Sequence, residues 1–234
     1  MKRALLVVSL LAAAACTSSS GDIRTVETAR PLTVRHAPSP SPALAPPATV
    51  STSPSAAPVA ARGDVDGDGQ ADTVSVTATT LTVALSAGHS VSAPIVASDV
   101  PKPVVSGLAD LDRDGRAEVW VETARGASTT FVQVYRYDGT KLSELTFAGG
   151  HIRFGIGGSV THGDGFACTP EGHLVVSTAE SDDGTSYRIR TRTFRVAGAT
   201  LVLVTDRSAT ASSMDDPRVR AAYQVDCGSV GESG

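Results

Sequence analysis

The sequence predicts an all-β domain made of about three antiparallel units, which follows a long N-terminal segment of a different composition. Three observations lead to this fold class. Apolar and polar residues alternate with a period of two, turn dipeptides separate the alternating runs, and a nine-residue acidic pattern occurs twice, 46 residues apart. A period of two places successive side chains on opposite faces of a strand, and no stretch shows the longer period of an amphipathic helix.

The predicted strands are short runs rich in β-branched and aromatic residues, which favour extended structure. They cover residues 72–77, 80–85, 118–122, 131–135 and 174–177. The turn signals are Ala87-Gly88, Asp138-Gly139, Asp183-Gly184 and Ala197-Gly198. Residues 137–140 (Tyr-Asp-Gly-Thr) lie between two strand-like runs and predict a β-hairpin. One short helical turn is expected within residues 216–223, beginning at Pro217.

The strands fall into three successive units. Residues 69–74 match residues 115–120 in pattern, and a weaker third copy begins at Gly172. The equivalent positions that open the units are Asp64, Asp110 and Cys168, and Cys227 holds the corresponding place after the third unit. Successive spacings between these positions are 46, 58 and 59 residues. We therefore expect three sheet-like units of several strands each.

The N-terminus has the organisation of a signal peptide over residues 1–15. Lys2 and Arg3 precede a run of apolar and small residues that is too short to span a membrane, and Cys16 follows directly. This arrangement resembles a bacterial lipoprotein signal, which implies cleavage before Cys16, diacylglyceryl modification of its thiol, and anchoring to the outer face of the cell membrane. The alternative is an ordinary secretory peptide that is cut nearby and leaves Cys16 as a chance thiol.

Residues 16–61 are rich in Pro, Ser and Ala and contain no aromatic residue, so they predict a disordered tether. Residues 62–228 are long enough to bury a core and form the predicted β-domain, and residues 229–234 are expected to be a disordered tail. The formal net charge of −4 gives no basic surface for nucleic acid.

Two acidic loops are the strongest functional signal. Each places carboxylates at positions 1, 3, 5 and 9 and a glycine at position 6, where a sharp turn needs positive φ. Alternate carboxylates folded around such a turn suit Ca²⁺, which takes six to eight oxygen ligands, better than Mg²⁺. The predicted ligands are Asp64, Asp66, Asp68, Asp72 and the carbonyl of Gln70 in loop one, and Asp110, Asp112, Asp114, Glu118 and the carbonyl of Arg116 in loop two. The alternative is a pair of solvated acidic turns.

An EF-hand does not fit these loops, because position 12 is Ser75 in one and Val121 in the other, and strands follow instead of helices. The pattern D-x-D-x-D-G-x-x-[DE] leading into a strand resembles the FG-GAP or VCBS repeats of integrin-like β-propellers, in which this loop holds Ca²⁺. The resemblance covers residues 63 to about 123 well, and residues 165–206 by strand pattern only. Similar signal, tether and repeat segments occur in actinobacterial lipoproteins.

The sequence does not decide whether the predicted strands close into a propeller. The third loop, residues 168–173, lacks the carboxylate series, and a complete propeller generally has at least four blades. Three blade-like units are compatible with an incomplete or small propeller, a curved sheet or a sandwich. If Cys16 carries lipid, Cys168 and Cys227 remain as an even pair in an oxidising compartment, which predicts a disulfide, with two buried free thiols as the alternative.

Catalytic motifs find little support. Residues 157–161 depart from the nucleophile elbow at their last position, and the histidines, including His151 and His162 in a predicted Gly-rich loop, have no zinc-ligand spacing. Three arginines at period two, Arg188, Arg190 and Arg192, would share one strand face. They are either an anion or acidic-glycan patch or a solvated face balanced by Glu180, Asp182 and Asp183.

These observations predict a calcium-stabilised cell-surface lipoprotein whose β-domain binds an unknown protein or glycan. A cell-envelope hydrolase or hydrolase accessory module is one alternative, and a purely structural envelope component is another.

Overall fold

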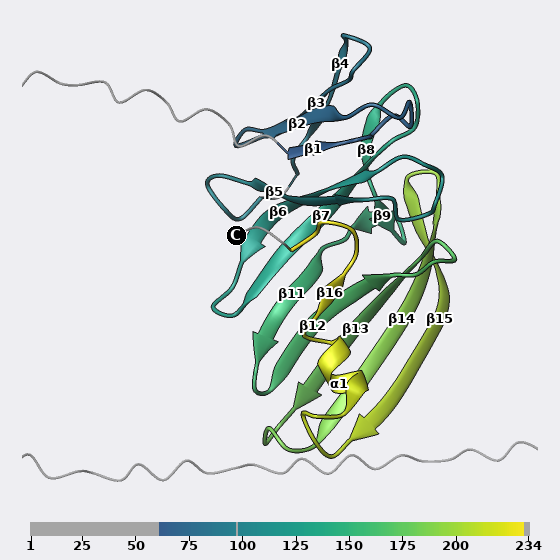
Figure 1. Ribbon diagram of the computed structural model, residues 1–234. Coiled ribbons are helices and arrows are strands. Elements are labelled where there is room, and N and C mark those ends of the chain that lie inside the picture. Colours follow the sequence, from purple (N-terminus) through teal and green to yellow (C-terminus); the bar gives the residue numbers. More distant parts are fainter. Residues whose placement is uncertain (1–60, 97, 232–234) are drawn as a thin grey trace, which may run out of the picture. The chain divides into compact units, whose positions relative to one another are not determined.

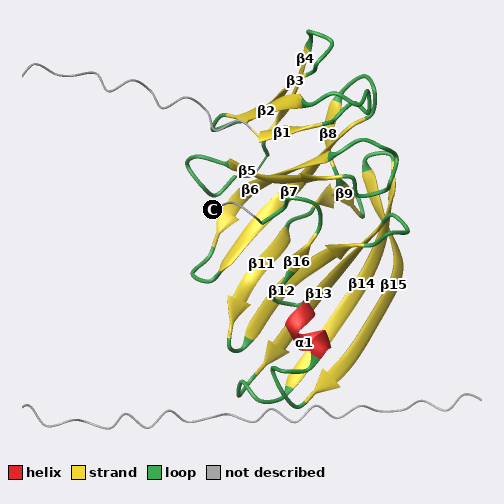
Figure 2. Cartoon of the chain, in the orientation of Figure 1, coloured by secondary structure: helices red, strands yellow, loops and turns green. Residues whose placement is uncertain are grey.

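The computed structural model describes residues 61–96 and 98–231. The predictions for the signal peptide, the lipidated Cys16 and the tether up to residue 60 lie outside these residues. Strands dominate the described part of the chain, with one short helix (Figure 2). The strands are β1 (Ala61–Gly63), β2 (Asp72–Val76), β3 (Thr80–Ala84), β4 (Ser90–Pro94), β5 (Val104–Ala109), β6 (Glu118–Arg125), β7 (Thr129–Tyr137), β8 (Leu142–Glu144), β9 (Thr146–Phe147), β10 (Gly150–His151), β11 (Phe154–Ser159), β12 (His162–Cys168), β13 (His173–Ser181), β14 (Tyr187–Ala197), β15 (Thr200–Ala211) and β16 (Val225–Asp226).

The strands form two sheets, one of four strands and one of twelve (Figure 1). The small sheet has the order β1-β2-β3-β4, with antiparallel neighbours. The large sheet has the order β10-β9-β15-β14-β13-β12-β11-β7-β6-β5, with β8 added to β7 and β16 added to β12. The β12–β16 and β15–β9 pairs are parallel, and the other pairs in this sheet are antiparallel.

This architecture confirms the predicted all-β, propeller-like fold, and the sheets do not close. The first unit is the small sheet, and the second is β5 to β8, in which the β7–β8 hairpin predicted at residues 137–140 is present. The third unit is continuous with the second, because β11 pairs with β7 and sets Phe154 opposite Val132. The second and third units are therefore one twisted sheet, not separate blades.

The Gly-rich segment around His162 is a pair of strands, β11 and β12, and not the predicted loop; His151 likewise lies in the short strand β10. The glycines serve close packing instead of flexibility. A Cβ on Gly163 would lie 2.4 Å from the Tyr223 ring, and one on Gly165 would lie 2.4 Å from the carbonyl oxygen of Gln224. The C-terminal segment can cross β12 only because these side chains are absent (Figure 1).

Strand β6 is buried on both faces and links two hydrophobic clusters. Val119 and Val121 pack with residues of the small sheet, whereas Trp120 lies in the second cluster, which fills one face of the large sheet. The Trp120 ring stacks on Phe166 with centroids 4.6 Å apart and is fully buried. The protein's one tryptophan is therefore a core residue.

The predicted helical turn is α1 (Pro217–Ala221), which begins after Asp216, whose side chain accepts a hydrogen bond from the N–H of Arg218. Val219 packs against Tyr187 of β14. No helix in the described part of the chain combines the length and apolar character that a membrane span requires.

The predicted disulfide between Cys168 and Cys227 is present, with the two Cα atoms 4.8 Å apart. It joins the end of β12 to the residue that follows β16. The packed chain also continues past the predicted boundary at residue 228, because the backbone N–H groups of Ser229 and Gly231 donate to carbonyls of β5 and Val230 is buried. The expected tail thus begins no earlier than residue 232.

Candidate functional site

Loop one connects β1 to β2, and its backbone holds the carboxylates in place. The two oxygens of Asp64 accept hydrogen bonds from the N–H groups of Gly67 and Gly69, at 2.7 and 2.8 Å. Asp72 is the fully buried first residue of β2, and it accepts from the N–H groups of Val65 and Ser86, both at 2.8 Å. Backbone hydrogen bonds therefore fix the positions of these two acids.

Three of the five predicted loop-one ligands converge. Carboxylate oxygens of Asp64, Asp66 and Asp72 lie within 4.8 Å of one another. Asp68 lies outside this group, because its carboxylate accepts from the Ser86 hydroxyl at 2.5 Å and from the N–H of Gln70 at 2.7 Å. The hydrogen bond from the Gln70 N–H to Asp68 thus stabilises the turn that carries the three converging acids.

The loop-one carboxylates form no ion pair with another described residue. Among the ion pairs between described residues, none involves a loop-one carboxylate. The pKa of Asp66 is raised above its ordinary value by desolvation and by repulsion from Asp72, Asp68 and Asp64. Oxygen-only donors, converging on one point with unneutralised negative charge, fit a hard cation such as Ca²⁺.

Loop two connects β5 to β6 and repeats the same backbone pattern. Asp110 accepts from the N–H groups of Asp114 and Gly115, and fully buried Glu118 accepts from the N–H of Leu111 at 2.8 Å. Arg113 and Gly115 have positive φ, as do Gly67 and Gly69 at the matching positions of loop one. Oxygens of Asp110, Asp112 and Glu118 lie within 4.8 Å of one another.

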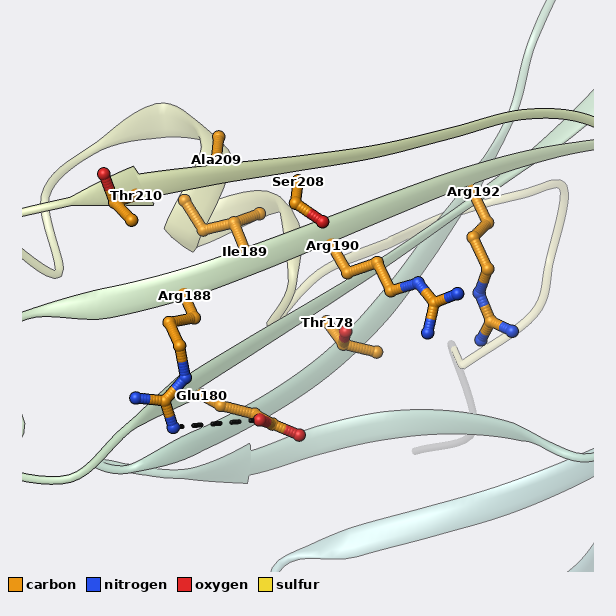
Figure 3. Close-up of a pocket in the computed structure, with 9 residues that line it drawn as sticks. All are labelled: Thr178, Glu180, Arg188, Ile189, Arg190, Arg192, Ser208, Ala209 and Thr210. Atoms are coloured by element: carbon orange, nitrogen blue, oxygen red, sulfur yellow. Dashed lines mark ion pairs between the residues drawn. The ribbon is translucent and has the colours of Figure 1, made fainter. Parts of the chain in front are cut away.

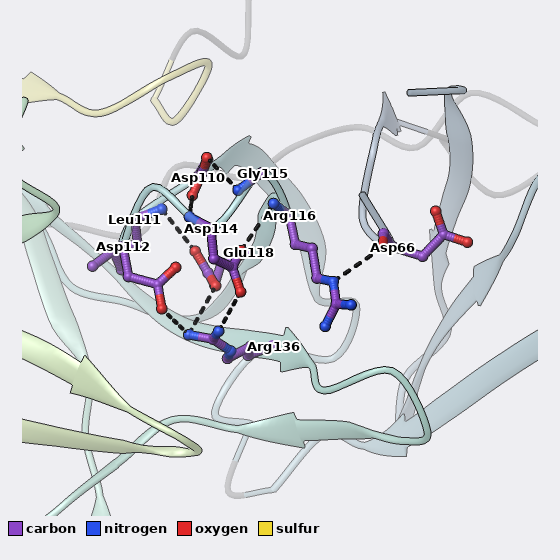
Figure 4. A network of polar contacts seen from close by, with 9 residues as sticks. All are labelled: Asp66, Asp110, Leu111, Asp112, Asp114, Gly115, Arg116, Glu118 and Arg136. Atoms are coloured by element: carbon purple, nitrogen blue, oxygen red, sulfur yellow. Dashed lines mark hydrogen bonds and ion pairs between the residues drawn. The ribbon is translucent and has the colours of Figure 1, made fainter. Parts of the chain in front are cut away.

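An arginine from β7 distinguishes loop two from loop one (Figure 4). The Arg136 guanidinium pairs with Asp112 and, at 2.5 Å, with Asp114, and it lies 3.8 Å from Oε1 of Glu118. Burial is the main cause that raises the pKa of Glu118 to about 8, and the negative charges of Asp112 and Asp114 raise it further. The sequence pattern identified the acids of this loop but not their basic partner.

Arg116 contacts loop one through its side chain. Its Nε donates to the carbonyl oxygen of Asp66 at 3.0 Å, and the neighbouring Ala117 N–H donates to the carbonyl of Asp64 at 2.8 Å. The two acidic loops are therefore hydrogen-bonded neighbours (Figure 4). The Arg116 carbonyl was the predicted ligand, whereas the described contact is made by the guanidinium.

A second feature is a pocket of about 670 Å³ on one face of β13, β14 and β15 (Figure 3). It is lined by Thr178, Glu180, Arg188, Ile189, Arg190, Arg192, Ser208, Ala209 and Thr210. The arginine row predicted from the period of two is present on this face.

Most of the arginine charge in this pocket is balanced. Arg188 pairs with Asp182 at 2.9 Å, and Arg190 makes two hydrogen bonds to Asp206, an acid that the sequence analysis did not single out. Arg192 lies over the ring of Phe194, 5.7 Å from its centroid. Acids thus accompany two of the three arginines, as the solvated-face alternative expects.

Two histidines are paired with carboxylates. His162 contacts Asp164 at 2.7 Å on β12, and His151 contacts Glu144 at 2.7 Å. The sequence pattern does not predict these pairs, because it places both histidines in a loop, whereas they lie in β10 and β12.

One family model of known proteins matches the part of the chain that contains the acidic loops. Residues 64–121 match the family model of the FG-GAP-like repeat, and this span includes both loops. No curated protein and no solved structure gives a significant match. This part of the chain is therefore similar to an FG-GAP-like repeat.

Proposed function

We propose that this protein is a calcium-stabilised interaction module, held at the outer face of the cell membrane through lipidated Cys16. The observation that carries the calcium part is the convergence of the Asp64, Asp66 and Asp72 carboxylates within 4.8 Å, with no ion pair to any of the three among the described residues. The lipoprotein-like N-terminus and the FG-GAP-like repeat support the remaining parts.

Bound calcium would neutralise the repulsion between the loop-one carboxylates. Asp72 connects this site to the fold, because it contacts the N–H of Val65 in the loop and the N–H of Ser86 after β3. Arg116 connects the loop to the second repeat through the carbonyl of Asp66. A cation held here would therefore fix the β1–β2 connection and its junction with the neighbouring loop.

The pocket on β13 to β15, which three arginines line, is the candidate contact surface. Its ion pairs are exposed and therefore weak in water, so Arg188 and Arg190 can exchange their intramolecular carboxylates for those of a ligand. The hydroxyls of Thr178, Ser208 and Thr210 add hydrogen-bonding groups. A protein or glycan that carries carboxylates and hydroxyls would match this lining.

A hydrolase has weaker support in the described residues. Glycoside hydrolysis generally uses two carboxylates across the scissile bond, whereas Glu180 is the one carboxylate that lines this pocket, and it lies 4.0 Å from Arg188.

Thermal unfolding with and without calcium tests the proposal. Extracellular modules bind Ca²⁺ with Kd of about 10⁻⁴ to 10⁻³ M, so 10 mM Ca²⁺ would stabilise the native state by about 1.4–2.7 kcal/mol. For a domain of this size that corresponds to a rise in Tm of roughly 3–11 °C. Asp64→Asn should abolish the rise, and Asp215→Asn, at an exposed acid outside both loops, should preserve it. Equal Tm values for the wild type in calcium and in chelator would refute the calcium site.

A further inference from the structure

The two acidic loops, alike in sequence, differ in what neutralises them. In loop two the Arg136 side chain reaches from β7 to Asp112, Asp114 and Glu118, with its nearest nitrogens 2.5 Å from Asp114 and 3.8 Å from Glu118 (Figure 4). Its side chain is only 14% exposed, so this positive charge is largely removed from solvent. A buried guanidinium with carboxylates on two sides is costly to displace, because displacement would leave charges uncompensated.

Strand register explains why the strand that pairs with the end of loop one offers no cation equivalent to Arg136. Pairing of Val119 with Tyr135 sets Arg136 opposite Glu118, the ninth residue of loop two. Pairing of Thr73 with Ala84 likewise sets Leu85 opposite Asp72, the ninth residue of loop one. The position that carries a guanidinium in one repeat thus carries a buried aliphatic side chain in the other.

We infer that Arg136 takes the place of a metal ion in loop two, so that the protein binds a single calcium ion, at loop one. Calcium binding at loop one rests on the proposed function, whereas the role of Arg136 in loop two does not depend on it. A divalent cation in loop two would have to approach the same carboxylates that already contact Arg136, against the repulsion of its charge. Loop two therefore receives a positive charge from within the chain, whereas loop one depends on an ion from solution.

The experiment counts the ions that the mature protein releases on unfolding. Above Kd, the slope of the unfolding free energy against the logarithm of calcium concentration is proportional to the number of bound ions. We would measure this slope for the wild type, Asp64→Asn, Asp110→Asn and Arg136→Gln. Arg125→Gln is the matched control, because Arg125 also pairs with an acid of β6, Glu122, but lies outside the loops. Equilibrium dialysis with radioactive calcium would give the count independently.

The expected counts are one for the wild type, zero for Asp64→Asn, and one for both Asp110→Asn and the control. Arg136→Gln should raise the count to two, and adding Asp110→Asn to it should restore one. A wild-type count of two that Asp110→Asn lowers, or a folded Arg136→Gln protein with an unchanged count, would overturn the inference.

The two proposals fail separately. A wild-type count of zero, with a gain of one in Arg136→Gln that requires Asp110, would reject calcium at loop one and still support the role of Arg136. If Arg136→Gln does not fold, the Asp110→Asn protein decides alone: an unchanged count supports the inference, and a lower count overturns it.

Discussion

Reduction of the Cys168–Cys227 disulfide is expected to destabilise the domain strongly. The bridge joins two segments 59 residues apart in sequence, and the loop it closes contains β13, β14, β15 and α1. Strand β16 has only two residues, so the bridge is the main covalent constraint that keeps the C-terminal segment beside β12. Without it, the unfolded chain gains conformational freedom that it must lose again on folding.

The magnitude follows from the length of the closed loop. In the chain-entropy model a loop of this length corresponds to about 4 kcal/mol of stabilisation. For a domain of 150–250 residues, each kcal/mol shifts Tm by about 2–4 °C, so reduction should lower Tm by roughly 8–16 °C.

Urea unfolding with and without a phosphine reductant measures this difference. Trp120 is the reporter, because it is the sole tryptophan and stacks on Phe166 in the core. A Cys168→Ala/Cys227→Ala protein should not respond to the reductant, which controls for other effects of the reagent. If the reduced wild type keeps an unfolding free energy within about 1 kcal/mol of the oxidised form, the loop-closure reasoning is wrong.

Three further predictions concern the anchor, a buried acid and a packed glycine. Cys16→Ala should release the protein from the membrane fraction or stall its processing, and an intact-mass spectrum of native protein without a diacylglyceryl group would reject lipidation. In chelator, the free energy of unfolding should fall as pH rises from about 4.5 to about 8, because the raised pKa of Glu118 lets the folded state hold a proton that the unfolded state has lost. Urea unfolding at several pH values should show that Glu118→Gln removes this pH dependence. Parallel stability–pH profiles for the wild type and the variant would contradict the prediction. Gly165→Ala places a Cβ 2.4 Å from a backbone oxygen of the C-terminal segment and should cost about 1–3 kcal/mol in urea unfolding. Gly150→Ala, where the nearest atom is 3.8 Å away, is the control, and equal losses in the two variants would show that the contact is unimportant.

The sequence was sufficient for the parts of the fold that depend on local chemistry. The alternation of residues predicted strands, and the glycine at position 6 predicted a turn that brings Asp64 close to Asp72. Pro217 and the residues after it predicted the helical turn. Equivalent positions in successive units predicted the pairing of Cys168 with Cys227, because repeated units place such positions in comparable surroundings.

Features that depend on long-range register were not predictable in the same way. Arg136 is 18 residues from Glu118 in sequence, and it meets the acids of loop two only because β6 and β7 pair in one particular register. The glycines of β12 look like loop residues until the C-terminal segment is known to cross them. The second and third units are continuous because β7 pairs with β11, and no local sequence pattern predicts this pairing.

The C-terminal segment packs against strands that come much earlier in the sequence, and this affects how the chain folds. The Ser229 hydroxyl accepts a hydrogen bond from the N–H of Leu108, 121 residues earlier, and β16 runs beside β12. Contacts so distant in sequence form only after a large loop has closed, and proteins dominated by them fold slowly. A chain in which residues 225–231 are not yet available can complete neither the edge of β5 nor the cover over β12. Cooperative folding of the domain must therefore wait for this segment.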